Sequence, residues 1–526
     1  MAGRALSVTL DGLTGRVIEV EADMVGGIPT TVIVGLPDAS VSEARDRCRS
    51  AVVNSGAPWP DQRVTVNLAP STLPKSGSHY DLAIAMAVLA AQKAVAPETL
   101  SGTAFVGELA LDGRLRAAPG VLPATLAAAD GGCSHVVVPE VNVPEAELVD
   151  GITVTGVRSL RQLVAMMTGE EQPDDPPVPP LEASGAQPWG SSERLARLDL
   201  ADVAGHEDVR LAVLAAAVGG HHLAMVGPPG VGKTMLAQRL PGLLPDLERQ
   251  DAIEVSAVHS VAGLLPSDTP LLTRPPFLDP HHTASAAAIV GGGSRQVRPG
   301  AMSLAHRGVL FLDEAPEFAS NVLEALRQPL ESGRVVVARA AQTAVYPARF
   351  QLVLASNPCP CGQAASLDGS CRCTPAMRRR YGEKLSGPIR DRIDIRRTLT
   401  APTRPELAAS VAPGRGTAEL AERVRLARER QHERYADTPW RLNADVPGPE
   451  LRRQWPVAES ARLLLERNLR SDRLNPRSAD RVLRLAWSIA DLLGHDRPTD
   501  EDVRTALSLR SDLPLDASMR ELVSAE

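Results

Sequence analysis

The residue types and spacing with the clearest chemical meaning lie at 227–234. They read Gly227, Pro228, Pro229, Gly230, Val231, Gly232, Lys233 and Thr234. An apolar run at 223–226 precedes the segment and a helical pattern at 235–240 follows it, so it joins a buried strand to a helix. In that context backbone N–H groups can surround phosphates, Lys233 can reach the β- and γ-phosphates, and the Thr234 hydroxyl can ligate Mg²⁺. The segment predicts a binding site for a nucleoside triphosphate.

Two acidic residues, Asp313 and Glu314, end an apolar run at 308–312 that reads as a second buried strand. Asp313 would position Mg²⁺ through its water shell, and Glu314 would orient and polarise the attacking water. An apolar run that ends in Asp-Glu is common by itself. Its place about eighty residues after Lys233, with further strands available, predicts a hydrolytic site.

Three more side chains are candidates for contact with the γ-phosphate. Asn357 follows a strand predicted at 350–355 and would hold the attacking water, although it can also be a turn residue before a proline. Arg392 fits an arginine finger that enters the site of a neighbouring subunit, which requires an oligomer; the alternative is a solvated surface arginine. Arg477 stands just before a long predicted helix and fits a second phosphate-sensing arginine.

Four of the 6 cysteines crowd into 359–373. Cys359 and Cys361 form one Cys-x-Cys pair, and Cys371 and Cys373 form another. Four thiolates can close a tetrahedral Zn²⁺ site, but these pairs are tighter than the usual Cys-x-x-Cys, so free thiols that pack a loop remain the alternative.

The chain of 526 residues is too long for one compact core. We expect an N-terminal α+β domain at 1–171, a Pro-rich linker at 172–195, an α/β core with a parallel sheet at 196–400 and a helical domain at 401–526. In the first domain we predict strands at 30–35, 63–68 and 134–139 and a helix at 81–91. In the last we predict helices at 419–434, 457–468, 478–493 and 500–509, with Thr499 as the cap of the final one.

Bulk composition excludes several classes of protein. The formal net charge of −7 gives no overall attraction to nucleic acid or to anionic membranes. No run of about eighteen apolar residues predicts a membrane span, and the N-terminal residues lack the apolar core of a secretory signal. We expect a cytoplasmic protein with reduced thiols that does not act at a membrane.

The series formed by Asp-Val-Ala-Gly at 202–205, the phosphate loop, the Leu-Asp-Glu strand, the sensor asparagine and the two arginines is similar to AAA+ ATPases. More narrowly, the chain resembles the magnesium-chelatase-like ComM/YifB family. Five segments carry this resemblance: Pro-His-His-Thr-Ala-Ser at 280–285, Arg-Pro-Gly at 298–300, 304–314, Tyr-Pro-Ala-Arg-Phe at 346–350 and Asn-Pro-Cys-Pro-Cys-Gly at 357–362. The resemblance spans nearly the whole chain. It implies ATP and Mg²⁺ as cofactors and a C-terminal helical lid. One departure is Arg390, at a position expected to be apolar, which is a rival candidate for the finger.

The family carries a Lon-protease-like (ribosomal S5 domain 2-like) fold at its N-terminus, and the segment at 106–115 resembles part of it. Lon-type peptidases use a serine that a lysine activates. Where the serine is expected the chain has His79, Tyr80 and Asp81, and the adjacent Lys75 and Ser76 fall outside the motif. We therefore expect a docking or DNA-handling module and no peptidase.

Two arginine-bearing segments are candidates for contact with DNA. The segment at 334–346 is similar to the hairpin that related ring ATPases insert into their channel, with Arg339 near its tip, and 291–298 is a loop with Arg295 and Arg298. Repetition around a ring concentrates such charge without making the subunit basic. We expect a homohexameric ATP-driven motor on single-stranded or branched DNA, and the resemblance implies branch migration or helicase work. The alternatives are a protein-remodelling ATPase of the magnesium-chelatase type and a regulatory nucleotide-binding module without turnover.

Overall fold

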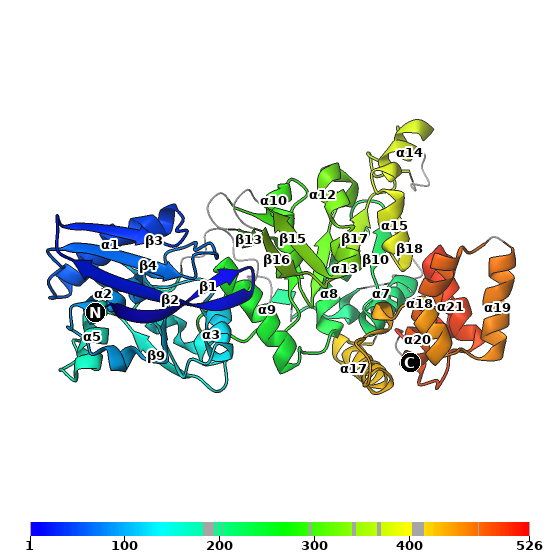
Figure 1. Ribbon diagram of the computed structural model, residues 1–526. Coiled ribbons are helices and arrows are strands. Elements are labelled where there is room, and N and C mark those ends of the chain that lie inside the picture. Colours follow the sequence, from blue (N-terminus) through cyan, green and yellow to red (C-terminus); the bar gives the residue numbers. More distant parts are fainter. Residues whose placement is uncertain are drawn as a thin grey trace.

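The computed structural model of the chain describes residues 2–181, 194–195, 197–203, 205–293, 297–338, 343–364, 370–401, 415–471 and 473–524. They form three regions along an elongated molecule, with one sheet at one end, a second sheet in the middle and a bundle of helices at the other end (Figure 1). In the described part of the chain, no helix is both long and apolar enough to cross a membrane.

The N-terminal region is built on a mixed sheet with strand order β3-β4-β2-β1-β5-β8-β9. Its strands are β1 (Gly3–Asp11), β2 (Thr14–Val25), β3 (Thr30–Val34), β4 (Arg63–Ala69), β5 (Thr103–Phe105), β8 (His135–Pro139) and β9 (Thr153–Val157). Strand β2 pairs antiparallel with β1 and β4, and the other neighbours in the sheet pair in parallel. The strands predicted at 30–35, 63–68 and 134–139 are confirmed as β3, β4 and β8.

Helices cover this sheet, and α2 is its central one. The helices are α1 (Ala39–Asn54), α2 (Asp81–Ala91), α3 (Val121–Asp130), α4 (Val143–Ala146) and α5 (Leu160–Thr168). Every residue of α2 is buried, as its apolar composition predicts. Its single charged residue, Asp81, pairs with Arg47 at 2.7 Å, so the buried carboxylate has a partner.

The predicted linker at 172–195 is described only in part. Residues 172–181 form no helix or strand, but they pack on the N-terminal region. The Nε atom of Arg161 donates to Asp175 Oδ2 at 3.0 Å, and Val178 is buried in the same hydrophobic cluster as α2. This half of the linker is therefore held against the N-terminal sheet, while 182–193 lies outside the described residues.

The central region carries a parallel sheet with strand order β11-β14-β17-β10-β18. Its strands are β10 (Leu223–Val226), β11 (Phe277–Leu278), β14 (Val309–Leu312), β17 (Gln351–Ser356) and β18 (Ile395–Thr398). The main helices are α7 (Glu207–Gly219), α8 (Lys233–Arg239), α9 (Arg249–Ala262), α12 (Ser320–Ala325), α13 (Pro329–Ser332), α14 (Pro375–Glu383) and α15 (Gly387–Arg392). The strands predicted at 223–226, 308–312 and 350–355 are confirmed as β10, β14 and β17.

The N-terminal and central regions meet where α3 and α4 contact α9. The Ser260 hydroxyl donates to Glu145 Oε2 at 2.6 Å, and the Gly120 amide donates to the Ser260 carbonyl at 3.0 Å. Burial raises the pKa of Glu145, although its hydrogen bonds from Ser260 and Asn142 oppose the shift. The contact is buried and its polar groups are satisfied.

The C-terminal region is entirely helical in its described part. Its helices are α17 (Thr417–Arg434), α18 (Gly448–Gln454), α19 (Glu459–Arg470), α20 (Pro476–Leu493), α21 (Asp500–Ser511) and α22 (Ala517–Arg520). The four predicted helices are confirmed as α17, α19, α20 and α21, and the Thr499 side chain caps α21 by accepting from the Asp502 amide. Leu485 of α20 and Leu211 of α7 belong to one hydrophobic cluster, so the helices and the central sheet share a core.

Candidate active site

Strand register brings the phosphate loop, the predicted acids and the predicted sensor asparagine to one edge of the central sheet. Val226 at the end of β10 lies opposite Ser356 at the end of β17, and Leu312 at the end of β14 lies opposite Leu354. The phosphate loop, Asn357 and the Asp313–Glu314 pair each begin directly after one of these strands. Because the carboxyl ends of adjacent parallel strands meet, residues far apart in the sequence converge there.

The phosphate loop has the backbone shape that its glycines permit. Gly230 and Gly232 have φ angles of 76° and 96°, in the left-handed region that favours glycine. Gly227 lies so close to β18 that a Cβ atom there would be 2.8 Å from the Leu399 carbonyl oxygen. The loop is thus fixed against the sheet at its start, where the Gly227 amide donates to the Ser356 carbonyl at 3.1 Å, and it leads into the N-terminus of α8, where backbone amides can bind phosphates.

Lys233 is buried inside this loop. Its Nζ donates to the carbonyl oxygens of Gly227 at 2.6 Å and Pro228 at 2.9 Å, and to Asn357 Oδ1 at 3.1 Å. Burial lowers the pKa of Lys233, and the carboxylates at the end of β14 oppose that shift. The lysine therefore joins the loop to the predicted sensor asparagine.

Thr234 and Asp313 are in direct contact. The Thr234 hydroxyl donates to Asp313 Oδ2 at 2.7 Å, and Asp313 Oδ1 accepts from the Glu314 amide at 2.8 Å. A hydroxyl and a carboxylate oxygen side by side, next to the place for phosphates, are ligands that Mg²⁺ prefers. These two residues fit the metal that the sequence predicted.

Glu314 has a partner that sequence reasoning did not identify. Its backbone has a φ of 50°, which is uncommon for a residue other than glycine. Its Oε2 lies 3.2 Å from Nδ1 of His282, in the loop after β11. His282 is thus a further candidate for the site. In the sequence, the Pro-His-His segment at 280–282 marks the family resemblance, and its two histidines read as loop structure and not as ligands, which gives no sign of this pairing.

Arg392 lies at the opposite, amino edge of the sheet. Nη1 of Arg481 donates to the Arg392 carbonyl at 2.9 Å and to Asp394 Oδ1 at 2.6 Å, and Asp394 accepts from the His222 amide just before β10. Burial alone would raise the pKa of Asp394, but Arg481 and His221 hold it well below its usual value. The phosphate loop follows the other end of β10, so Arg392 is remote from the loop of its own chain.

The two rival fingers differ in their surroundings. The Arg392 side chain donates to the Pro388 carbonyl at 2.6 Å and is paired with Glu331. Arg390, two residues earlier in α15, is exposed. Both residues belong to α15, which lies at the edge of the sheet opposite the phosphate loop of the same chain.

Arg477 lies at the same amino edge and is exposed in the first turn of α20. Its neighbour Ser478 accepts from Arg510 at 3.1 Å, and Arg510 also donates to the Ile393 carbonyl at 2.8 Å. The sequence placed Arg477 and Arg392 in separate domains. The fold brings both to one edge and neither to the phosphate loop.

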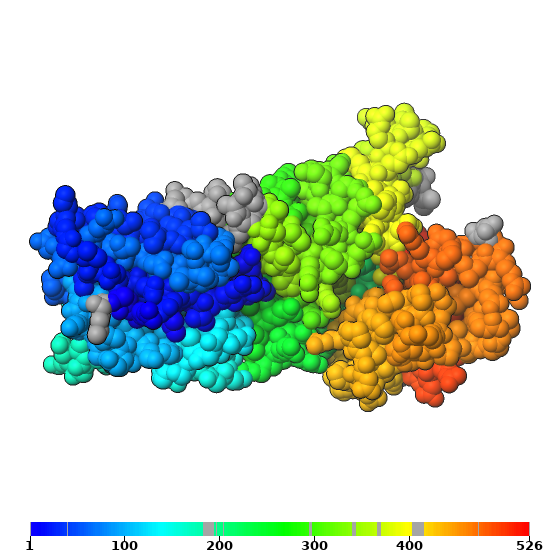
Figure 2. All heavy atoms as spheres, in the orientation of Figure 1, coloured from blue at the N-terminus to red at the C-terminus, as the bar shows by residue number. Residues whose placement is uncertain are grey.

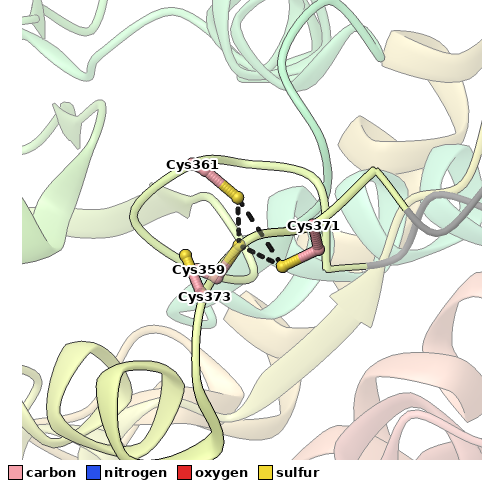
Figure 3. A group of neighbouring side chains, drawn as sticks. All are labelled: Cys359, Cys361, Cys371 and Cys373. Carbon is pink, nitrogen blue, oxygen red and sulfur yellow. Dashed lines mark hydrogen bonds between the residues drawn. The ribbon is translucent and has the colours of Figure 1, made fainter.

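The four predicted metal ligands converge beside the sensor asparagine. The Sγ atoms of Cys359, Cys361, Cys371 and Cys373 all lie within 4.8 Å of one another (Figure 3). Cys48 and Cys133 are buried elsewhere, as expected of core residues. The sequence therefore identified a set of thiols that the fold brings together.

The two arginine-bearing segments are neighbours. The predicted hairpin is confirmed in its arms, β15 (Arg334–Ala338) and β16 (Thr343–Pro347), and β12 (Gly291–Gly292) pairs with β13 (Arg298–Pro299). The Tyr346 hydroxyl donates to the Val297 carbonyl at 2.8 Å, which ties the two segments together. Arg298 is exposed, whereas Arg339 and Arg295 lie outside the described residues.

Two of the side chains considered for a peptidase centre in the N-terminal region are bonded to backbone carbonyls. The buried Lys75 ammonium donates to the Pro70 carbonyl and not to the hydroxyl of Ser76. His79 is also buried, and its Nε2 lies 2.9 Å from the Val8 carbonyl oxygen. These groups are engaged with the backbone of the sheet, and they do not form a serine–lysine pair.

Comparison with known families identifies three matching segments. The family described as magnesium chelatase, subunit ChlI, matches residues 199–407. A second ChlI family matches 20–142, and the ChlI C-terminal family matches 414–510. The matches therefore fall on all three regions of the molecule.

Relatives match over nearly the whole length. A Mycobacterium tuberculosis protein is 52% identical over 97% of this chain and 98% of its own length. YifB of Escherichia coli is 40% identical over 95% of each chain, and the competence protein ComM of Haemophilus influenzae is 38% identical over 95% of this chain and 96% of its own. The chain therefore belongs to the ComM/YifB family of magnesium-chelatase-like proteins, a family of the AAA+ ATPase type.

Proposed function

We propose that this protein hydrolyses ATP at the carboxyl edge of its central sheet. The observation that carries the proposal is the contact between Thr234 and Asp313, next to Lys233 and Glu314. Lys233 would exchange its bonds to loop carbonyls for bonds to the β- and γ-phosphates, and Glu314 would take a proton from the attacking water while Asn357 holds that water in place. Mg²⁺, when bound by Thr234 and Asp313, would neutralise charge on the phosphates.

The proposed assembly is a homohexameric ring. Arg392, or its rival Arg390, lies at the edge of the sheet opposite the phosphate loop, together with Arg477. In a head-to-tail arrangement that edge would face the nucleotide of the next subunit, where a guanidinium can stabilise charge on the transferred phosphoryl group. The finer fold assignment belongs to the same proposal: a Lon-protease-like domain at 1–171, an AAA+ core at 196–400 and a lid at 401–526.

The proposed substrate of the motor is single-stranded or branched DNA, with branch migration or unwinding as the work done. Two observations support it. The hairpin β15–β16 and the loop that carries exposed Arg298 lie together, and helix α14, with the exposed residues Arg378, Arg379 and Arg380, stands out from the body of the molecule (Figures 1 and 2). Similarity to the competence protein ComM favours DNA as the partner.

A protein-remodelling role has less support. The magnesium-chelatase 38 kDa subunit of Rhodobacter capsulatus is 29% identical over only 30% of this chain. Zn²⁺ is the further cofactor proposed, at the four clustered thiols, and the proposed compartment is the cytoplasm, where such thiols stay reduced.

The test follows the processing of a labelled Holliday junction by the wild-type protein and by Glu314→Gln. Wild-type protein is expected to process the junction only with ATP, and the variant is expected to bind ATP but to lose turnover by about a hundredfold or more, because it lacks the base. ATP hydrolysis without any effect on DNA would favour a protein client. Absence of turnover in the assembled wild-type protein would favour a regulatory nucleotide-binding module.

A further inference from the structure

The geometry of the four thiols matches a tetrahedral metal site. Cys359 Sγ lies 3.3 Å from Cys361 Sγ and 3.7 Å from Cys371 Sγ, and the last two are 3.6 Å apart. Zn–S bonds of about 2.3 Å in a tetrahedron place sulfur atoms about 3.8 Å apart. A disulfide would need about 2.05 Å, and all four cysteines are free.

Two segments of chain supply these thiols, and each is anchored. Cys359 and Cys361 follow β17 directly, and Cys371 and Cys373 lead into α14 (Figure 3). Nη2 of Arg378 in α14 lies 3.2 Å from Cys371 Sγ. Four thiolates around Zn²⁺ carry a net charge of −2, and a guanidinium at that distance offsets part of it.

The same loop packs on the nucleotide site. Asn357 stands two residues before Cys359, and Gly362 directly follows Cys361. Gly362 has a φ of 77°, and a Cβ atom there would lie 2.6 Å from Cδ of Pro229 in the phosphate loop. The backbone of the cysteine loop is thus in close contact with one wall of the phosphate loop.

We propose that one Zn²⁺ ion is bound by the four thiols of Cys359, Cys361, Cys371 and Cys373. We propose further that this ion holds the loop at 357–362, which carries Asn357, against the phosphate loop. With the ion bound, Gly362 stays on Pro229 and Asn357 stays within reach of Lys233. Without it, only weak thiol contacts join the two segments, and the position of Asn357 loosens. The second half of this inference rests on the proposed ATPase activity, whereas the metal site does not.

The metal site is tested first, by metal analysis of full-length protein purified under reducing conditions. We expect about one Zn²⁺ per chain, lost in Cys371→Ser and kept in the matched control Cys133→Ser. Cobalt exchanged into wild-type protein should show the absorption of tetrahedral thiolate ligation. Metal-free wild-type protein with four titratable thiols in this loop, or with a disulfide between them, would overturn the site.

The contact with the phosphate loop is tested with Gly362→Ala, whose new methyl group would meet Pro229. Gly382→Ala in α14 is the matched control, because nothing lies within 4 Å of the Cβ position there. We expect Gly362→Ala to keep its zinc but to lose about ten- to a hundredfold in kcat/KM for ATP, and Gly382→Ala to keep both. Wild-type turnover by Gly362→Ala would overturn the coupling.

Removal of zinc by a chelator provides a second measurement that needs no variant. The metal-free chain should lose about as much ATP turnover as Gly362→Ala does, and it should recover that turnover when Zn²⁺ is restored. A chain that binds zinc but hydrolyses no ATP in any form would contradict the proposed function and leave the metal site standing. A chain that hydrolyses ATP equally well with and without zinc would contradict the coupling alone.

Discussion

In the nucleotide loop, the Lys233 ammonium is already bonded to two loop carbonyls and to Asn357. A buried cation needs such partners, because burial without them costs several kcal/mol. In the proposed reaction, incoming phosphates would therefore replace existing bonds of Lys233. This exchange would release Asn357 from the lysine when the γ-phosphate binds, and so would couple nucleotide binding to the placement of the attacking water.

His282 gives the sharpest residue-scale prediction. Its Nδ1 lies 3.2 Å from the Glu314 carboxylate, so replacement by alanine should leave the base poorly oriented. We expect His282→Ala to lower kcat for ATP about tenfold with little change in KM, because the role proposed for Glu314 is in the chemical step and not in binding. Steady-state kinetics measure kcat and KM separately.

His281 is the matched control. It is adjacent in sequence, but its Nδ1 lies 2.8 Å from the Thr283 hydroxyl and not at Glu314. His281→Ala should therefore keep wild-type kcat. Equal losses of kcat in the two variants would mean that turnover depends on the structure of the loop at 280–285 and not on the pairing of His282 with Glu314.

At the scale of elements, the central sheet separates the two groups of residues that we propose for the catalytic site. Its carboxyl edge carries the phosphate loop and the acids, and its amino edge carries Arg392 and Arg477. A strand of four residues, such as β10, spans about 13 Å, so one chain cannot bring both edges to one phosphate. If Arg392 or Arg477 contacts the γ-phosphate, as we propose, a second copy of the chain must therefore supply it.

Mixing two inactive variants tests this arrangement. Arg392→Ala keeps its own phosphate loop, and Lys233→Ala keeps its own arginines. Neither variant should hydrolyse ATP alone. In a random mixture of equal amounts, about a quarter of the boundaries between subunits should pair an intact Lys233 with an intact Arg392, so we expect about a quarter of the wild-type ATPase rate. Activity measured against the mixing ratio reports the result.

The variant Arg390→Ala, measured in the same ATPase assay, distinguishes the two candidate arginine fingers. We expect Arg390→Ala to keep most of its activity, since Arg392 ends α15 beside the Arg481–Asp394 pair while Arg390 is exposed. Loss in Arg390→Ala with retention in Arg392→Ala would exchange their roles. Full activity of Arg392→Ala and Arg390→Ala combined would remove the finger altogether.

At the scale of the whole molecule, the half-buried His222 and the buried His259 should make the protein sensitive to acid. Burial lowers the pKa of His222 to about 4 and that of His259 to about 3, below the unfolded value of about 6.5. His222 Nδ1 accepts from the Leu352 amide at 3.0 Å, which requires a deprotonated nitrogen. Between pH 6.5 and about 4 the unfolded chain binds protons that the folded chain does not, so stability falls as the pH falls.

The expected slope is at most about 1.4 kcal/mol per pH unit for each histidine. Midpoints of urea unfolding across this range measure it. His222→Gln should flatten the slope, and the exposed His135→Gln should leave it unchanged. A wild-type midpoint that does not move between pH 6.5 and 4.5 would contradict the assignment of neutral buried histidines.

Much of the fold was predictable because local patterns reflect burial. The strands at 223–226 and 308–312 are short apolar runs that end at glycine or acid, and runs of that length and context favour a buried strand. The helix at 81–91 was predicted with its observed bounds, because an uninterrupted Ala, Leu and Ile run of that length must be buried on every side. The predicted boundary at 172 is less clear in space, since a Pro-rich composition cannot reveal that Val178 packs on the sheet.

The amino-acid sequence by itself determined the local chemistry: glycines that allow the φ angles of the phosphate loop, a lysine and a threonine after them, acids at a strand end and paired thiols. Tertiary structure alone decided which of these groups meet. It brought His282 within ion-pair distance of Glu314, and it packed Gly362 of the cysteine loop against Pro229. It also placed Arg477 and Arg392 together at the amino edge of the central sheet. Spacing along the chain encodes neighbours within one element, whereas contacts between elements follow from strand order and packing, which no local pattern specifies.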